Sequence, residues 1–194
     1  MPASPSLVPT AGKDTSTTME IPAITTPRLV LRPFARQDAE PLHAILSEKD
    51  FLRYFPNTSP PPLDRVENYI DAQLKHWEEH HYGRWAVVLR DDGRLVGWNG
   101  LQYLPDTREI EIGYILARPL WNQGLTSEGA LACLRFAFEE LGLEQIVGIV
   151  HPENHASQRV LEKLGMVFTN RTEYFGMEVF RYQIAAADFS NQDA

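Results

Sequence analysis

The sequence of 194 residues contains a single cysteine, Cys133, and no apolar run long enough to span a membrane. One cysteine cannot form an intrachain disulfide or a Cys-rich zinc site, and it suits a reducing compartment. The longest apolar stretches, such as residues 146–150, fall far short of the roughly 20 residues that cross a bilayer. These absences predict a soluble, cytoplasmic protein.

Basic residues are also scarce. Lys and Arg number 18 against 26 Asp and Glu, so the formal net charge is -8. A chain of this charge is poorly suited to hold nucleic-acid phosphates or anionic lipids without sequence specificity, and a cationic partner or substrate fits it better. We therefore expect neither a nucleic acid nor a membrane as a partner.

The first 20 residues lack arginine and any apolar stretch, and ten of them are Ser, Thr or Pro. Secretory signals need an apolar core and transit peptides are rich in arginine, so neither is expected. The composition favours a disordered extension over residues 1–24, with Met19 as an alternative start. One domain is then expected over residues 25–187, followed by a flexible tail over residues 188–194.

Hydrophobic periodicity in residues 25–187 predicts a mixed α/β fold. Strands are expected at residues 28–34, 84–90, 94–103, 109–116, 145–150, 167–173 and 178–185. Helices are expected at residues 38–46, 62–80 or 64–80, 127–141 and 154–164. Three successive strands pair as antiparallel neighbours through short turns, which predicts a largely antiparallel central sheet flanked by helices.

Single residues set several of these helix boundaries. Asp38 is expected to cap the first helix, and Gly83 is expected to end the second. The second helix carries apolar residues at three- and four-residue steps, which predicts one buried stripe made of Val66, Tyr69, Ile70, Leu74 and Trp77.

A glycine-bearing loop at residues 121–128 joins an expected strand to the start of a helix. The first N–H groups of a helix have no intrahelical acceptor and lie at the positive end of its dipole, so they suit a pyrophosphate. Gly124 lets the backbone approach such a group closely. The alternative is an ordinary cap in which Thr126 or Ser127 satisfies the first turn. The segment is neither a Walker loop nor a dinucleotide fingerprint.

Alternation along the strand at residues 109–116 places Glu109 and Glu111 on one face, together with Gly113. The helix at residues 62–80 carries His76 and His80 one turn apart.

No third metal ligand is evident beside the two histidines, so surface histidines and no metal are expected. Cys133 lies within an apolar helix and is expected to pack as a small hydrophobic residue. The aromatic residues Tyr54, Trp85, Trp98 and Tyr103 are candidates for a substrate pocket, with core packing as the alternative.

Four segments occur in an order typical of one enzyme family: residues 26–32 (TPRLVLR), 111–116 (EIGYIL), 121–128 (WNQGLTSE) and 154–166 (NHASQRVLEKLGM). Together they resemble the GNAT superfamily of acetyl-CoA-dependent N-acetyltransferases, in particular its ribosomal-protein-alanine-acetyltransferase-like branch. The resemblance covers nearly all of residues 25–187. It implies the acyl-CoA N-acyltransferase fold, in which the strands before and after the loop splay so that acetyl-CoA enters between them.

The resemblance also implies which residues contact the cofactor. The backbone of the loop residues is expected to hold the CoA pyrophosphate: Gln123, Gly124, Leu125, Thr126 and Ser127. The backbone of Leu116 is expected to bind the pantetheine arm, and Asn154 is expected to reach the cofactor from the neighbouring helix. Trp121 is usual at the first position of the loop in this branch, whereas Asn122 and Thr126 stand where Gly and Ala are common. Because these contacts are mostly backbone N–H groups, binding is expected to persist.

Acetyl transfer to an amine requires a base, because an α-amino group has a pKa of about 7.7–8.0 and a lysine about 10.4. Glu111 matches the family's position before Gly-Tyr and is the expected base, with Glu109 in reserve. The alternative is that both are solvated strand residues. A backbone N–H near Leu116 is expected to stabilise the oxyanion. Many relatives protonate the leaving thiolate with a tyrosine at the position of Leu161, so Ser157 is the expected acid here. Its alternative role is a hydrogen bond to backbone or cofactor.

The acceptor is a primary amine whose identity stays open. The resemblance favours a protein N-terminal α-amino group, and the acidic balance suits a small cationic amine of the polyamine or aminoglycoside type. A further alternative is a CoA-binding regulatory domain without turnover, because Leu161 replaces the family's tyrosine. A monomer or a homodimer is expected.

Overall fold

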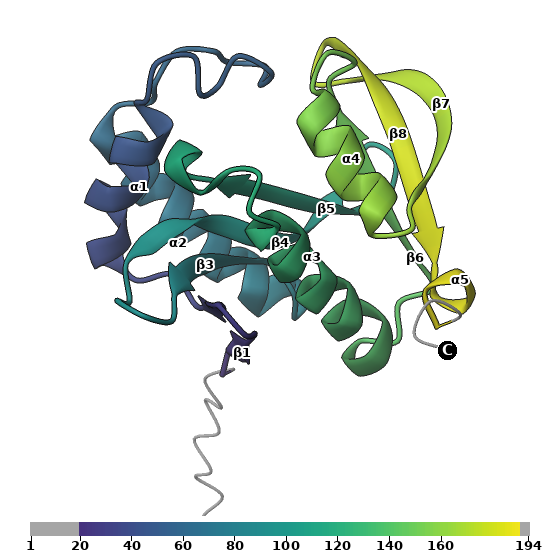
Figure 1. Ribbon diagram of the computed structural model, residues 1–194, viewed down its shortest axis with the longest axis horizontal. Helices are drawn as coiled ribbons and strands as arrows, with labels where there is room; N and C mark the ends of the chain where they lie inside the picture. The colour runs from purple at the N-terminus through teal and green to yellow at the C-terminus, as the bar shows by residue number, and fades with distance from the viewer. Residues whose placement is uncertain (1–19, 191–194) are drawn as a thin grey trace, which may run out of the picture.

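The computed structural model describes residues 20–190, which form a single eight-stranded sheet (Figure 1). The strand order is β1-β2-β3-β4-β5-β6-β8-β7. The strands are β1 (Ile24–Thr25), β2 (Leu29–Arg32), β3 (Arg84–Leu89), β4 (Leu95–Leu104), β5 (Glu109–Leu116), β6 (Gln145–Val150), β7 (Val167–Tyr174) and β8 (Met177–Ala185). All neighbours are antiparallel except β5 and β6, which are parallel. The predicted fold class is confirmed.

Helices cover both faces of the sheet (Figure 1). The long helices are α1 (Ala39–Leu46), α2 (Leu63–His80), α3 (Leu125–Arg135) with a π-helical end (Phe136–Glu140), and α4 (His155–Lys163). Shorter helices are α5 (Ala186–Ser190) and 3-10 turns at Arg36–Asp38 and Arg118–Leu120. Ala86 and Val88 of β3 pack on the side of α1 and α2, whereas Val87 packs in the core with α3 and α4. Alternation along the strand therefore supplies both cores.

Asp38 is the residue before α1, as expected, but its side chain makes no hydrogen bond to the first turn of α1 and forms a buried ion pair instead. Its side chain is 2% exposed. Its carboxylate accepts hydrogen bonds from the Arg32 guanidinium at 2.7 Å and from the Ala35 backbone N–H at 2.8 Å. Burying a carboxylate requires such partners, and the pair ties β2 to the start of α1.

The helix α2 ends at His80, as expected, but Gly83 does not end it. The residue that caps the helix is His81, which adopts the left-handed conformation with φ 62°. Gly83 instead lies against Trp77, and a Cβ there would come within 2.6 Å of the indole ring. The glycine therefore makes room for the buried tryptophan at the end of the stripe.

The folded part extends beyond the expected limits of the domain. The boundary expected at residue 187 falls inside α5, where Phe189 is 4% exposed and packs against Phe138 with ring centroids 5.1 Å apart. At the other end, the Pro22 carbonyl accepts a hydrogen bond from the Trp85 indole at 2.7 Å. Residues 1–19 of the expected extension and residues 191–194 of the expected tail lie outside the described residues. In residues 20–190, no helix is both long and apolar enough to cross a membrane.

The two parallel strands at the centre of the sheet diverge, as expected. Their register aligns Glu111 with Val147. Beyond that point β5 stays paired with β4 as far as Leu116, and β6 stays paired with β8 as far as Val150. The carboxyl halves of the two strands thus leave an opening between the two parts of the sheet.

Candidate active site

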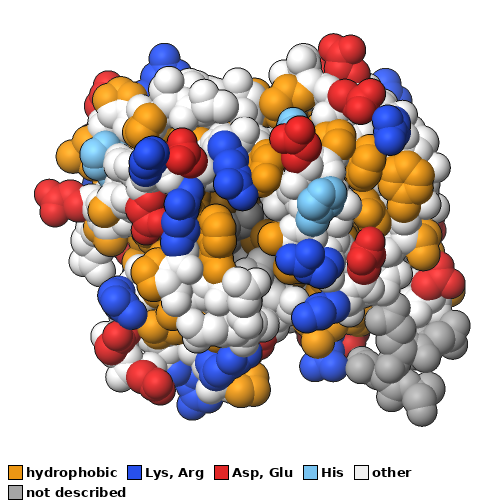
Figure 2. Space-filling model, turned by 45° about the horizontal axis from the view of Figure 1, so that its top comes forward, with side chains coloured by type: hydrophobic (Ala, Val, Ile, Leu, Met, Phe, Trp, Pro, Cys, Tyr) orange, Lys and Arg blue, Asp and Glu red, His pale blue; other side chains and the backbone are white. Residues whose placement is uncertain are grey.

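A cavity of about 580 Å³ occupies the opening between β5 and β6 (Figure 2). Its walls come from the carboxyl halves of both strands, the first turn of α3, the first turns of α4 and the segment between α1 and α2. Figure 2 shows it as a hollow between the two halves of the molecule, with Lys and Arg side chains on both sides. The cavity is large enough for an extended ligand that enters between the strands.

Most residues that the sequence singled out line this cavity: Glu111, Leu116, Gly124, Leu125, Thr126, Ser127, Asn154 and Ser157. Gln123 lies outside that set. Its carbonyl accepts a hydrogen bond from Arg28 Nη1 at 2.9 Å, and its side-chain amide donates to the Pro119 carbonyl at 3.1 Å. Its backbone and side chain therefore shape the loop.

The loop before α3 has the geometry of an anion site. Gly124 is the residue before the helix, and its φ of 78° is a left-handed conformation that favours glycine. The first helical bond from this turn joins Glu128 N–H to the Gly124 carbonyl at 3.0 Å. The N–H groups of Leu125, Thr126 and Ser127 precede it and are the donors that a helix start leaves for a ligand. These residues therefore fit a pyrophosphate.

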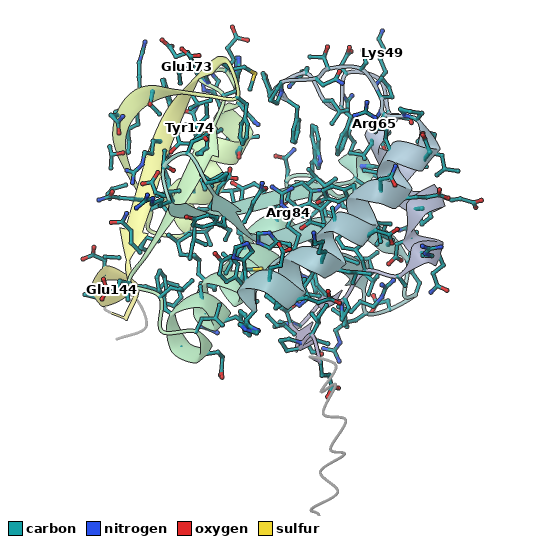
Figure 3. All side chains as sticks on the ribbon, turned by 180° about the vertical axis from the view of Figure 1, so that it is seen from behind. Lys49, Arg65, Arg84, Glu144, Glu173 and Tyr174 are labelled. Atoms are coloured by element: carbon teal, nitrogen blue, oxygen red, sulfur yellow. The ribbon has the colours of Figure 1, made fainter. Side chains whose placement is uncertain are left out.

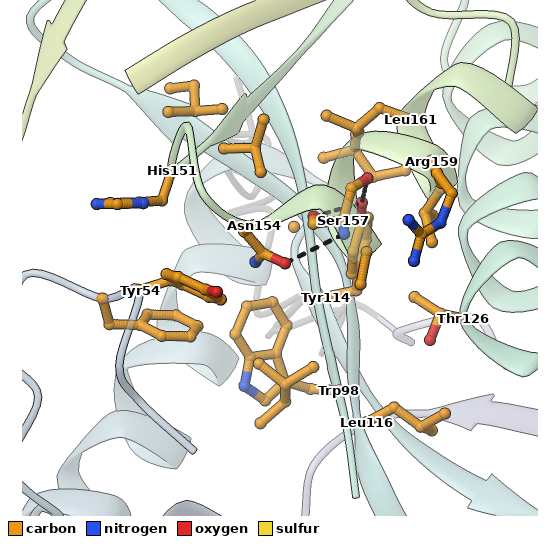
Figure 4. A pocket seen from close by; sticks show the side chains of 18 of the residues that line it. Tyr54, Trp98, Tyr114, Leu116, Thr126, His151, Asn154, Ser157, Arg159 and Leu161 are labelled. Atoms are coloured by element: carbon orange, nitrogen blue, oxygen red, sulfur yellow. Dashed lines mark hydrogen bonds between the residues drawn. The ribbon is translucent and has the colours of Figure 1, made fainter. Parts of the chain in front are cut away.

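Two cations on α4 add positive charge to this end of the cavity. Arg159 and Lys163 line it, and Figure 4 shows Arg159 on the same side as Thr126. Charged donors bind phosphate oxygens more strongly than neutral ones. The phosphates of CoA can thus meet side-chain cations as well as backbone N–H groups, which the sequence did not indicate.

The N-terminal motif at residues 26–32 fastens this loop to the sheet through Glu128. The Glu128 carboxylate accepts hydrogen bonds from Thr26 Oγ1 at 2.6 Å, from the Arg28 backbone N–H at 2.8 Å and from Arg28 Nε at 2.7 Å. Burial alone would raise the pKa of Glu128, but these hydrogen bonds and the Arg28 charge lower it below its ordinary value. Glu128 therefore stays ionised and holds the first turn of α3 in place.

We expect Glu128→Ala to weaken CoA binding about tenfold, because the first turn of α3 loses its charged tie to β2. Isothermal titration calorimetry with CoA measures the dissociation constant. The matched control is Glu140→Ala, which removes an exposed carboxylate at the far end of the same helix. Equal affinities for the two variants would show that the Glu128 cluster does not shape the loop.

Trp121 joins the loop to the end of β5. Its indole Nε1 donates to the Leu116 carbonyl at 2.5 Å. One lone pair of that carbonyl is therefore already used, and the expected contact between Leu116 and a pantetheine arm has to use the other lone pair or the N–H. The tryptophan at the first loop position thus has a structural role at the mouth of the splay.

Glu111 lies in the interior of β5 at the point where β5 and β6 diverge, and it is 9% exposed. Burial raises the pKa of Glu111 from 4.5 to about 7, and the nearby positive charge of Arg84 partly opposes this rise. A carboxylate that is half ionised near neutral pH has the pKa that suits a general base.

Glu109, the second candidate for the base, forms hydrogen bonds with residues of β7 and β8. It accepts hydrogen bonds from the Arg181 guanidinium and, at 2.7 Å, from the Tyr174 hydroxyl, which Figure 3 shows on the β7–β8 side. Partial burial would raise the pKa of Glu109, but the hydrogen bonds from Arg181, Tyr174 and Thr107 lower it below its ordinary value. It is outside the cavity lining and is a weak base, so the two carboxylates that share a face have different roles.

Ser157 forms a hydroxyl pair with Tyr114 in the cavity (Figure 4). Its Oγ lies 2.9 Å from the Tyr114 hydroxyl oxygen, which also donates to the Ser157 carbonyl at 3.2 Å. Asn154 caps α4 by accepting from the Ser157 N–H at 3.2 Å. Burial raises the pKa of Tyr114, although the Ser157 hydrogen bond opposes this, so the phenol stays protonated. Strand alternation puts Tyr114 on the face opposite Glu111, so the contact with Ser157 cannot be inferred from the local pattern.

Leu161, which stands at the position of the family's tyrosine, lines the cavity wall as a buried side chain.

Of the four aromatic candidates, Tyr54 and Trp98 line the cavity. Tyr54 stacks on His151 with centroids 5.2 Å apart, across the mouth from Thr126 (Figure 4). Trp85 is fully buried in the core, and Tyr103 stacks on His80 away from the cavity. The end opposite the anion site is therefore aromatic.

Charge in the cavity differs in sign from charge in the whole chain. Among the described residues that line it, Glu111 is the one carboxylate, whereas Arg53, Arg84, Arg159 and Lys163 are cations. The acidic balance of the whole chain therefore does not extend to the described residues that line the cavity.

His76 differs from the expected surface histidine. Its ring lies 4.4 Å from that of His80, and its Nε2 is buried. Burial, with repulsion from His80 and Arg84, lowers its pKa to about 4, so it is neutral at physiological pH. Within residues 20–190, no three His, Cys, Asp or Glu side chains are grouped so as to hold a metal ion.

The sequence of this chain is similar to those of known proteins. A family model described as an acetyltransferase (GNAT) domain matches residues 28–167. The uncharacterized N-acetyltransferase YoaA of Bacillus subtilis strain 168 is 32% identical over 145 residues, which are 74% of this chain and 82% of that protein.

Solved structures agree with this likeness. A GNAT-family acetyltransferase from Bacillus anthracis gives a TM-score of 0.75 at 26% identity, covering 85% of this chain and 99% of that one. Mutant forms of the spermidine/spermine N-acetyltransferase SpeG from Vibrio cholerae give a TM-score of 0.66 at 23% identity, covering 86% and 98%. At this identity, the similarity to SpeG shows a shared fold only.

Proposed function

Because the chain belongs to the GNAT acetyltransferase family, we propose that it transfers the acetyl group of acetyl-CoA to a primary α-amino group, with Glu111 as the base. The family uses acetyl-CoA as its co-substrate. The observation that carries the proposal is the buried Glu111, whose pKa of about 7 lies between those of an ordinary carboxylate and an amine. Its place at the start of the splay puts it in the path of an amine that approaches a thioester between β5 and β6.

Residues at the two ends of the cavity fit the two substrates. The first turn of α3, with Gly124, Arg159 and Lys163, suits the phosphates of CoA. The aromatic end, with Tyr54 and Trp98, suits the acceptor. Acetyl-CoA supplies an activated acyl group, so the protein has to orient the two substrates, remove one proton from nitrogen and provide one at sulfur.

Glu111 accepts the proton that the amine loses, either directly or through one water molecule. The Arg84 charge helps to keep Glu111 ionised and also disfavours a protonated amine beside it. Ser157 donates its hydroxyl hydrogen to the leaving sulfur and regains a proton from solvent, while Tyr114 orients that hydroxyl. A backbone N–H near Leu116 stabilises the negative charge that develops on the thioester oxygen.

Two alternatives make different predictions. A polyamine carries several positive charges, and the cavity offers it one carboxylate among several cations, so its binding is disfavoured. A regulatory domain would bind acetyl-CoA without turnover. Assaying thiol release with saturating acetyl-CoA and a panel of amines separates these cases. Amine-dependent release with monoamines preferred supports the proposal, whereas tight binding of acetyl-CoA with no amine-dependent release supports the regulatory alternative.

We expect Ser157→Ala to lower kcat about 10- to 100-fold and to change the KM for acetyl-CoA little, because the thiolate is a good leaving group that needs only modest help. Steady-state kinetics at pH 8 measures both constants. Ser47→Ala, which removes an exposed hydroxyl at the end of α1, is the matched control. Full turnover by Ser157→Ala would leave Ser157 a cofactor contact at most.

A further inference from the structure

Arg84 is a cation at the acceptor end of the cavity, and its side-chain hydrogen-bond partners among the described residues are neutral. Its Nη1 donates to the Tyr69 hydroxyl at 3.3 Å, and its Nη2 donates to Gln102 Oε1. The guanidinium carbon lies 4.1 Å from the centre of the Trp98 ring. Its buried Nε has no hydrogen-bond partner among the described residues. Figure 3 shows Arg84 near the centre of the molecule. A partly buried guanidinium without an ionised hydrogen-bond partner favours an anionic ligand.

Two glycines place this guanidinium beside Glu111. Arg84 of β3, Gly100 of β4 and Gly113 of β5 are directly paired across the sheet and so share a face. A Cβ at Gly113 would lie 3.5 Å from Arg84 Nη2, so the side chain reaches across β4 to β5. Glu111 is two residues before Gly113 and therefore on the same face. One cation and one carboxylate thus lie next to each other on the floor of the acceptor end.

The pair complements a molecule that carries an amine and a carboxylate close together. Glu111 takes the proton of the amine, and the planar guanidinium of Arg84 suits a carboxylate with two parallel hydrogen bonds. Glu111 only partly balances Arg84, because its carboxyl is half protonated near pH 7. A second cation on the acceptor would lie against Arg84 and be repelled.

The surrounding walls are apolar and aromatic. Tyr54 and Trp98 line the aromatic end of the cavity, and Phe55, Phe175, Met177 and Val179 line the same cavity. Phe55 and Phe175 are 37% and 60% exposed, which is high for phenylalanine. These side chains can bury an apolar group on the acceptor, and such burial is favourable in proportion to its area.

We propose that Arg84 binds the carboxylate of the acceptor and that the acceptor is a free α-amino acid with an apolar or aromatic side chain. This inference rests on the proposed function, because it names the acceptor of the same site. It distinguishes a free amino acid from a protein N-terminus, in which the carboxylate is replaced by a neutral amide. Arg84 is then a specificity-determining residue, and the amine rather than the carboxylate reaches Glu111.

The first experiment compares four acceptors with the wild-type protein and acetyl-CoA: L-phenylalanine, L-phenylalaninamide, the dipeptide Phe-Ala and phenethylamine. We expect kcat/KM for L-phenylalanine to exceed that for phenethylamine about 100-fold, because truncating one partner of a buried charge pair has effects of this size. The amide and the dipeptide should fall between them. Equal or better use of the dipeptide would overturn the inference in favour of a protein N-terminus, and preference for phenethylamine would also overturn it.

The second experiment repeats the comparison with Arg84→Gln and Arg84→Lys at pH 8.5. We expect Arg84→Gln to lower kcat/KM for L-phenylalanine about 100-fold more than it lowers kcat/KM for phenethylamine, so that the preference between the two acceptors is lost. Arg84→Lys keeps the positive charge but loses the planar guanidinium. It should therefore lower kcat/KM about tenfold for L-phenylalanine and leave that for phenethylamine unchanged. Arg94→Gln, an exposed arginine on the β3–β4 turn, is the control. A loss that is equal for all acceptors would overturn the inference.

Binding to the CoA complex separates this inference from the proposed function. Calorimetry measures the affinity of L-phenylalanine for the protein saturated with CoA, in wild type and in Arg84→Lys. Arg84-dependent binding without any acetyl transfer would support the carboxylate site and contradict the proposed function. If phenethylamine is acetylated while L-phenylalanine is neither acetylated nor bound, the proposed function is supported and the carboxylate site at Arg84 is overturned.

Discussion

Glu111→Gln should lower kcat/KM about 100- to 1000-fold at pH 7, which is the range for removal of a general base. Glutamine keeps the shape and buries a similar group, but it cannot accept the proton of an amine. The effect has two parts: only about a tenth of an α-amino group is neutral at pH 7, and the variant has no base to take the proton that the amine loses as it attacks.

The pH dependence makes this result specific. The pKa of Glu111 is about 7, so wild-type kcat/KM should rise with pH up to about 7 and then level off. In Glu111→Gln the rise should continue toward the pKa of the amine, and the loss relative to wild type should shrink above about pH 9. Initial rates of thiol release from pH 5.5 to 10 measure both profiles.

The matched control is Glu109→Gln, which changes the neighbouring carboxylate on the same face of β5. Glu109 is bound to Arg181 and Tyr174, so its replacement should lower stability and leave the bend near pH 7 in place. An unchanged profile in Glu111→Gln, or loss of the bend in Glu109→Gln, would remove the assignment of Glu111 as base.

The same substitution should make the protein more stable at alkaline pH. Burial raises the pKa of Glu111 from 4.5 to about 7, so the folded state binds its proton more tightly than the unfolded state. The stabilisation that this proton provides is present below pH 4.5 and is lost as pH rises through about 7. A rise of this size corresponds to about 3 kcal/mol, and Glu111→Gln avoids this loss above pH 7.

Urea unfolding at pH 5 and at pH 8.5 tests this expectation. The difference in unfolding free energy between Glu111→Gln and wild type should shift in favour of the variant by about 2–3 kcal/mol from the lower to the higher pH. Comparing the two pH values cancels any fixed cost of the amide. No shift, or a shift in favour of wild type, would show that Glu111 is not held in an unfavourable ionised state. Together with the activity loss, the shift would identify a residue retained for function at a cost in stability.

Local patterns explain why much of the fold was predictable. The strands β5 and β6 begin and end at the expected residues, because alternation and short turns are visible within a few residues. The loop before α3 is recognisable for the same reason, since a helix start and a glycine are neighbours in sequence. The end of α2 at His80 was predictable as well, but the residue that caps it was not, because His81 adopts the left-handed conformation while Gly83 makes room for Trp77.

Long-range contacts explain what the sequence could not show. Glu109 and Glu111 look alike in the strand, and only the contact with Arg181, 72 residues away, separates their roles. The Tyr114–Ser157 pair spans 43 residues, and Glu128 meets Arg28 across 100. A single sequence does not show which distant residues become neighbours in the folded sheet, so such contacts cannot be predicted from it.

Net charge was the least reliable guide to the site. A formal charge of -8 suggested a cationic acceptor, whereas the described cavity lining holds several cations and one carboxylate. Summed charge governs long-range steering, but the charges within a few ångströms of the ligand decide recognition. Arg84 therefore constrains the acceptor more than the surplus of surface carboxylates does.

A direct titration of Glu111 tests the central claim, that this buried carboxyl is the base of an acetyl transfer. The carboxyl carbons of glutamate are labelled with ¹³C, and their chemical shifts are followed by NMR from pH 4 to 9, with Glu111→Gln used to assign the signal. We expect one glutamate to titrate at about pH 7, where wild-type kcat/KM also bends. Titration of Glu111 near its ordinary value of 4.5, with the kinetic bend elsewhere, would contradict its role as the base.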